Sequence, residues 1–181
     1  YDNVHASMQP EKWDLNILYV VSSAVGLTAL ASSVILLSSV LASHDPTGIW
    51  AQLGLPEMSY GEIQTLVYLK ISLSDYFSVF NSRTKGWFWS RAPSVVLVGA
   101  FLIATGASTL LAVYWPFGNG MVGISWQMSG CCWLYVIVWA FIQDAGKVLT
   151  YQLLQYAGWV ESVAVIDEKQ LKKHAQQLMD V

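Results

Sequence analysis

Charged residues are missing from three long stretches of the chain, and these stretches define its first predicted elements. Ile17 to Ala42, Ser94 to Trp115 and Met121 to Ile142 contain no Asp, Glu, Lys or Arg. At about 1.5 Å per residue, a helix of each length can cross a hydrocarbon core of about 30 Å. The pattern therefore predicts three transmembrane helices at these positions.

A fourth apolar stretch, Ile63 to Phe80, is interrupted by Lys70 and Asp75. Taken alone, this stretch also fits a buried helix of a soluble protein. Its position between two charge-free stretches favours a crossing, because a chain that enters and leaves the membrane needs a return helix there. We therefore expect a fourth span over these residues.

The basic residues support four crossings rather than three. If all four stretches span, eight of the nine Lys and Arg residues lie on one side and the ninth, Lys70, lies within a span. The eight are Lys12, Arg83, Lys85, Arg91, Lys147, Lys169, Lys172 and Lys173. The positive-inside rule then places both termini and the loop between the second and third spans in the cytoplasm.

The pattern divides the chain into three parts and predicts an all-α, four-helix transmembrane bundle. Residues 1–16 form a cytoplasmic loop before the first span, and residues 17–144 form the bundle. Residues 145–181 form a cytoplasmic surface helix and tail. Apolar residues recur at helical spacing over Ala145 to Val160, which is typical of an amphipathic helix lying on a membrane. The tail after it fits either a solvated helix or a segment that docks on another domain.

Composition agrees with a membrane protein and narrows its chemistry. Hydrophobic residues make up 55% of the chain and charged residues 12%, against about 25% charged in soluble domains. The net charge is −3, and the sequence has no block of basic residues that would bind nucleic acid. The sequence has no Gly-rich phosphate loop, nucleophile elbow or metal-ligand spacing. We therefore expect no cofactor or metal site in this chain, and the lipid bilayer as its first partner.

Lys70 and Asp75 are the main candidates for chemistry, because a charge near the centre of a span costs about 2.5–3.5 kcal/mol. Their spacing puts them about 140° apart on a helix, and Ser74 and Ser78 fall in the arc between them. This polar side could line an ion path or hold a carboxylate of a neighbouring helix. Alternatively, Lys70 extends to the membrane surface and the other three make a polar helix contact.

Five sequence segments resemble one family, the plasma-membrane proton-pumping P-type ATPases. Tyr1 to Val4 and Gln9 to Leu15 are similar to the cytoplasmic loop after the sixth transmembrane helix of that family. Tyr68 to Asp75, Phe80 to Thr84 and Gly86 to Ser90 look like its eighth helix and the cytoplasmic exit of that helix. The four stretches would then be helices seven to ten, and the resemblance covers nearly the whole chain.

The resemblance implies a parent enzyme in the plasma membrane that hydrolyses ATP with Mg²⁺ through an aspartyl-phosphate and exports protons. It implies that the catalytic domains and the proton-carrying carboxylate of helix six belong to upstream sequence, so this chain is a fragment. Its partners would be the other transmembrane helices and the cytoplasmic domains of the same pump. The resemblance also implies an effect of Asp75 on coupling, because fungal members of the family are acidic at the matching position. Plant members are not acidic there, so the resemblance implies that Asp75 is not essential to the family's mechanism.

Two other interpretations remain open from the residues. The chain could be part of another cation-transporting P-type pump, such as a calcium pump, although such a pump would need more acidic and amide ligands in its spans. It could also be a complete four-span accessory protein, which would require an initiator Met near Tyr1.

Overall fold

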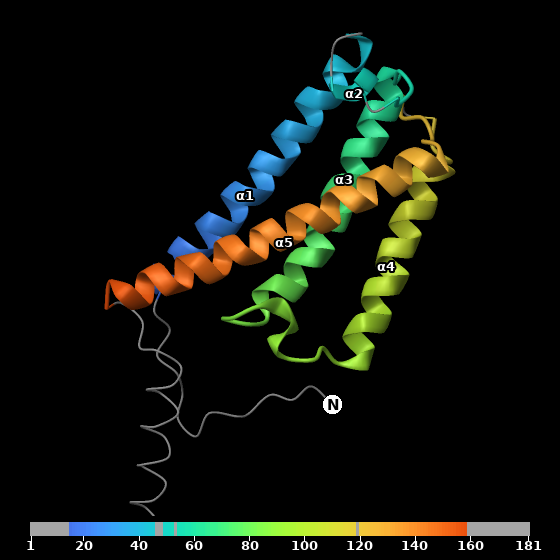
Figure 1. Ribbon diagram of the computed structural model, residues 1–181. Coiled ribbons are helices and arrows are strands. Elements are labelled where there is room, and N and C mark those ends of the chain that lie inside the picture. Colours follow the sequence, from blue (N-terminus) through green and yellow to red (C-terminus); the bar gives the residue numbers. More distant parts are fainter. Residues whose placement is uncertain (1–14, 46–48, 53, 119, 159–181) are drawn as a thin grey trace, which may run out of the picture.

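The computed structural model describes residues 15–45, 49–52, 54–118 and 120–158, and this part of the chain is helical with no strands (Figure 1). The elements are α1 (Leu15–Leu41), η1 (Ala42–His44), α2 (Ile49–Gln52), α3 (Tyr60–Ser82), η2 (Phe88–Ser90), α4 (Val95–Val113) and α5 (Trp126–Tyr156). The all-α prediction is confirmed. The predicted loop at residues 1–14 and the tail from residue 159 lie outside the described residues.

The four long helices alternate in direction, as a chain that crosses a layer four times must. α1 and α4 run one way, and α3 and α5 run the other way (Figure 1). α5 crosses obliquely over α1 and α3, so that its C-terminal end lies near the start of α1. The α3–α4 connection lies at this same end of the bundle, and α2 lies at the opposite end.

Serine residues fix the starts of three helices. Ser59 and Glu62 form a capping box on α3, in which the Ser59 hydroxyl accepts from the Glu62 N–H and the Glu62 carboxylate accepts from the Ser59 N–H. Ser94 and Ser125 cap α4 and α5 in the same way, each accepting from the backbone N–H three residues later. Such caps satisfy N–H groups that have no partner within the helix.

α3 packs against α1, α4 and α5, and its residues form much of the core. Its Leu66, Leu69 and Leu73 are fully buried and pack with Val40 of α1 and Val136 of α5 in one core cluster. The outer surface of the bundle is also apolar. For example, Val95 and Val96 at the start of α4 are 85% and 82% exposed. In water this surface would be unfavourable, whereas lipid tails would cover it.

Three helices are long and apolar enough to cross a membrane among the described residues, namely α1 extended by η1, α4 and α5. They correspond to the three charge-free stretches of the sequence. α3 has the length for a crossing but carries more polar residues. It connects the two ends of the bundle between α1 and α4, where the sequence predicted a fourth span.

The last predicted span and the predicted surface helix differ from the structure, which has one continuous helix, α5, in their place. Residues 121–125 precede this helix and are not helical. The helix does not end at Gln143 and Asp144, because both side chains are buried against other helices instead of facing water. Leu149, Leu153 and Tyr156 are exposed on this continuation, and Val160 of the predicted surface helix lies outside the described residues.

The segment before α5 fits tightly against the ends of α3 and α4. Val122 N–H donates to the Gly61 carbonyl of α3 at 3.3 Å, and Ile124 N–H donates to the Ala112 carbonyl of α4 at 3.0 Å. Glycine is required on both sides of this contact. A Cβ on Gly123 would overlap the Val113 carbonyl oxygen, and a Cβ on Gly61 would overlap Gly120 and Val122.

Candidate functional site

Lys70 lies inside the bundle, where it contacts α1. Its side chain is 2% exposed, and its Nζ donates to Ser33 Oγ at 2.6 Å and to the Ala29 carbonyl at 3.3 Å. Ser33 also donates to the Ala29 carbonyl at 2.9 Å. The ammonium therefore does not extend to the membrane surface. Its contacts are a hydroxyl and a carbonyl of α1, where the sequence had suggested a neighbouring carboxylate.

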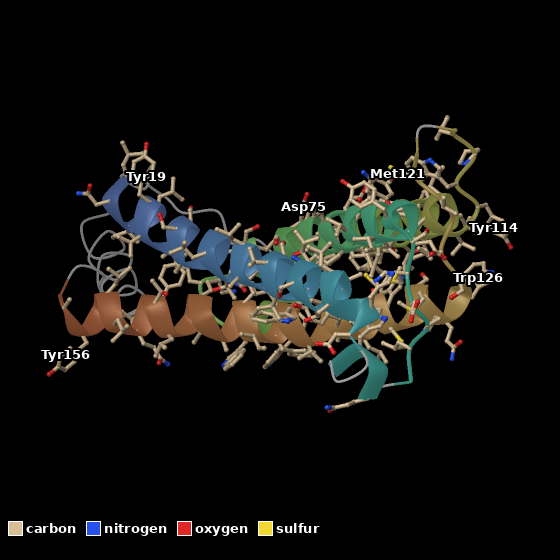
Figure 2. All side chains as sticks on the ribbon, turned by 90° about the horizontal axis from the view of Figure 1, so that it is seen from above. Tyr19, Asp75, Tyr114, Met121, Trp126 and Tyr156 are labelled. Carbon is tan, nitrogen blue, oxygen red and sulfur yellow. The ribbon has the colours of Figure 1, made fainter. Side chains whose placement is uncertain are left out.

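Asp75 lies on a different side of α3 from Lys70. Its side chain is exposed, and Figure 2 shows it at the edge of α3 that faces away from α5. The exposed residues Ile71 and Val79 precede and follow it by four positions, so they form a stripe along this open side. The predicted polar side of the helix is thus divided, with Lys70 facing the core and Asp75 facing outward.

Ser78 belongs to the inner group. The Gln143 Nε2 of α5 donates to Ser78 Oγ at 3.3 Å and to the Val25 carbonyl of α1 at 3.3 Å. One amide thereby joins three helices. Ser74 is half-buried and takes part through its backbone carbonyl, which accepts from Ser78 Oγ at 2.9 Å.

A second buried group of charges lies at the end of the bundle where α3 finishes. Lys147 Nζ donates to Asp144 Oδ1 at 2.6 Å and to the Asn81 carbonyl at 2.7 Å. Asp144 Oδ2 accepts from the Phe88 N–H at 3.0 Å, and Asn81 Nδ2 donates to the Ala140 carbonyl at 3.3 Å. We call Asn81, Phe88, Asp144 and Lys147 the end cluster. It joins α3, α5 and the α3–α4 connection.

The end cluster was not predicted, although the sequence contains a signal for it. Asp144 and Lys147 are three residues apart, a spacing that places both side chains on one face of a helix. The predicted bundle ended at residue 144, and a surface helix was expected from Ala145 onward. In the structure the side chains of Asp144 and Lys147 are at most 3% exposed, so their opposite charges neutralise each other inside the protein.

These contacts hold helices together and fix buried charges. Among the described residues, no group of three or more His, Cys, Asp or Glu side chains could hold a metal ion. The inner contacts of Lys70, Ser78 and Gln143 and the end cluster link α3 to α1 and α5. The carboxylate of Asp75 on α3 is exposed, so a group from outside this bundle can contact it.

The fold and these contacts define a bundle of membrane helices that is fastened by buried polar groups. No family model matches the chain. Its curated relatives include "Probable proton ATPase 1A" and "Probable proton ATPase 1B" of Leishmania donovani, each 34% identical over 83% of this chain. "Probable plasma membrane ATPase" of Dictyostelium discoideum is 24% identical over 84% of it.

The chain spans only 17% of the length of the Leishmania relatives and 16% of the Dictyostelium one. It is therefore related to a segment of the proton ATPases and not to their full length. The resemblance predicted from the sequence segments is confirmed: this chain is homologous to a membrane segment of plasma-membrane proton ATPases.

Proposed function

We propose that this chain is the supporting membrane bundle, helices seven to ten, of an ATP-driven, proton-exporting P-type pump. The observation that carries the proposal is the similarity over 83% of this chain to proton ATPases whose length it covers by only 17%. ATP, Mg²⁺ and the phosphorylated aspartate belong to other parts of the pump. The remaining transmembrane helices and the cytoplasmic domains of that pump are the partners of this bundle.

The contacts inside the bundle support a static role. Buried hydrogen bonds link α1 to α3 through Lys70 and link α3 to α5 through Gln143 and the end cluster. Separating these helices would leave buried charged or polar groups without partners, which is costly in lipid. The helices that move during transport can then shift relative to a bundle that keeps its shape. Moving one proton against 100 mV needs about 2.3 kcal/mol, which nucleotide hydrolysis can supply.

The open side of α3 supports a contact with the rest of the pump. A carboxylate exposed to lipid tails is unfavourable, so Asp75 needs a polar partner or an aqueous path beside it. The helices of the pump that lie outside this chain are the proposed source of that partner. In this arrangement Asp75 adjusts how proton movement is coupled to ATP hydrolysis, while Lys70 keeps its internal contacts.

The position of the charges supports a cytoplasmic location for both ends. The start of α1, the end of α5 and the α3–α4 connection lie at one end of the bundle. That connection contains Arg83, Lys85 and Arg91 and has no acidic residue. By the positive-inside rule this end faces the cytoplasm of the plasma membrane, and α3 completes the fourth crossing.

A chimera tests the proposal. The matching segment of the Leishmania "Probable proton ATPase 1A" is replaced by this chain, and the purified protein is placed in liposomes. We expect ATP-dependent acidification of the liposome lumen, followed with a pH-sensitive dye. The unchanged relative is the positive control, and the relative without the segment is the negative one. A chimera that assembles and hydrolyses ATP without acidifying the lumen contradicts the proposal.

The reading frame before Tyr1 provides a second, independent test. We expect it to contain an in-frame Asp-Lys-Thr-Gly-Thr phosphorylation motif and a preceding helix with a carboxylate. A start codon immediately upstream of Tyr1 would contradict the pump proposal, and the bundle would then need a role without catalysis.

A further inference from the structure

The α3–α4 connection, residues 83–94, presents aromatic and basic side chains together at one end of the bundle. Trp87 and Trp89 are 40% and 55% exposed, and their rings stack at 4.8 Å with an angle of 14° between the planes. Lys85 and Arg91 are exposed on either side of them. We call residues 83–94 the Trp loop.

Hydrogen bonds and ring contacts with α5 fix the position of the Trp loop. Thr84 Oγ1 donates to the carbonyls of Gly86 and Trp87 at 3.1 Å each, and the buried carboxylate of Asp144 accepts from the Phe88 N–H. Phe88 and Trp89 also pack beside Phe141 of α5, at ring distances of 5.7 and 6.3 Å. The bundle therefore presents the two tryptophans and the neighbouring cations in a fixed arrangement.

The exposed surface of the loop carries two cations, Lys85 and Arg91, and residues 83–94 contain no Asp or Glu. The carboxylate that reaches the loop from α5, Asp144, is 0% exposed and already forms an ion pair with Lys147. The exposed surface of the loop is accordingly complementary to an anion.

The surroundings place this surface at the height of lipid headgroups. The Trp loop is followed directly by Val95 and Val96, which are 85% and 82% exposed and suited only to lipid tails. On α5, the exposed Phe141 lies beside Trp89, and the next residue, Ile142, is also exposed. Tryptophan prefers this boundary because its ring is apolar and its N–H is polar.

We propose that the Trp loop binds the headgroups of anionic phospholipids. Lys85 and Arg91 contact the phosphate or carboxylate of the headgroup. The stacked Trp87 and Trp89 lie at the level of the glycerol backbone. Lipid is the occupant that the geometry favours over a protein domain, because the apolar first turn of α4 continues the same surface into the bilayer. The inference requires a bundle that spans a membrane and does not depend on proton pumping.

The test measures lipid binding by the 181-residue chain itself. The purified chain in detergent is titrated with phosphatidylserine or with zwitterionic phosphatidylcholine, and native mass spectrometry gives the dissociation constant for each bound lipid. Each basic residue near the headgroups contributes about fivefold in affinity for an anionic lipid. We expect Lys85→Gln/Arg91→Gln to weaken phosphatidylserine binding by about 25-fold and to leave phosphatidylcholine binding unchanged.

The matched control removes the same two charges elsewhere, as Lys172→Gln/Lys173→Gln, and we expect it to keep phosphatidylserine binding. Equal weakening by both double variants would overturn the proposal, since net charge alone would then explain the effect. A second variant, Trp87→Ala/Trp89→Ala, should weaken both lipids, and circular dichroism verifies that each variant keeps its helices.

Two further measurements distinguish a bound lipid from other ligands of the Trp loop. Inorganic phosphate at the same concentration as the lipid should not compete with phosphatidylserine, because it lacks the chains that lie along α4. Full competition by phosphate would overturn the lipid assignment. Unchanged lipid binding by the loop variants, together with lost ATP-dependent acidification in the chimera, would assign the loop to a protein domain and would also overturn it.

Discussion

Lys147 Nζ and Asp144 Oδ1 lie 2.6 Å apart on one face of α5, and both side chains are buried. The same two residues contact the Asn81 carbonyl and the Phe88 N–H, so one ion pair joins α5 to the end of α3 and to the Trp loop. A buried charge that loses its partner is far less favourable than a buried pair. Stability of the bundle should therefore depend on keeping both charges or on removing both.

The first prediction concerns this ion pair. Asp144→Leu leaves the Lys147 ammonium buried without a counter-charge, and we expect a loss of about 3–5 kcal/mol in the free energy of unfolding. The measurement is unfolding in mixed micelles by titration with a denaturing detergent. The double variant Asp144→Leu/Lys147→Met should recover most of this loss. A double variant as unstable as the single one would show that the hydrogen bonds, and not the charge balance, hold this end together.

The second prediction concerns Lys70, whose ammonium contacts two neutral oxygens of α1. Lys70→Met keeps much of the side-chain volume and removes a buried charge, and Ser33 keeps its bond to the Ala29 carbonyl. We expect a change of less than about 1.5 kcal/mol in the free energy of unfolding, in either direction.

Lys70→Ala is the matched variant, because it removes the charge and also creates a cavity. We expect it to destabilise the chain by about 2–5 kcal/mol in the same titration. If Lys70→Met were as unstable as Lys70→Ala, the positive charge itself would be needed at this position.

The positions of α1, α3 and α4 could be predicted from the sequence because they depend on local features. A charge-free stretch long enough to span gives a helix whatever its neighbours are, and Ser59 with Glu62 shows a capping box in the sequence alone. The outcome differs for polar residues within helices. Whether Lys70 and Asp75 face the core depends on how α3 is rotated against α1 and α5, and periodicity does not determine that rotation.

The end cluster shows a second limit of sequence reasoning. The last predicted span ended at Ile142, because the polar Gln143 and the charged Asp144 that follow are unfavourable in lipid. In the structure the helix continues through both residues. Phe88 and Lys147 supply the partners of Asp144, and Val25 and Ser78 supply those of Gln143. Partners that are distant in sequence cannot be inferred from the local pattern around a single polar residue.

The third prediction concerns Asp75, whose side chain faces out of the bundle. In the isolated chain, Asp75→Asn should not destabilise the bundle, since it removes no buried contact. In the assembled pump we expect the same substitution to change the number of protons moved per ATP while ATPase turnover is preserved. Parallel assays of acidification and phosphate release on one preparation measure this ratio. An unchanged ratio would reduce Asp75 to a packing residue.

The fourth prediction concerns the segment before α5, residues 121–125, which we call the α5 leader, and its close contact with the ends of α3 and α4. Gly123→Ala places a Cβ against the Val113 carbonyl oxygen, which belongs to the backbone and cannot rotate away. The segment must then shift and strain the hydrogen bond from Ile124 to Ala112, so we expect a loss of about 1–3 kcal/mol.

Gly99→Ala in α4 is the matched control, because a Cβ there meets nothing within 4 Å. A helical glycine in open space gains about 0.5–1 kcal/mol on replacement by alanine, through the reduced freedom of the unfolded chain. The two substitutions should therefore move the unfolding midpoint in opposite directions in one denaturing-detergent titration. If Gly123→Ala were neutral, the backbone approach between α4 and the α5 leader would not contribute to stability, and the apolar contacts around α3 would hold the bundle without it.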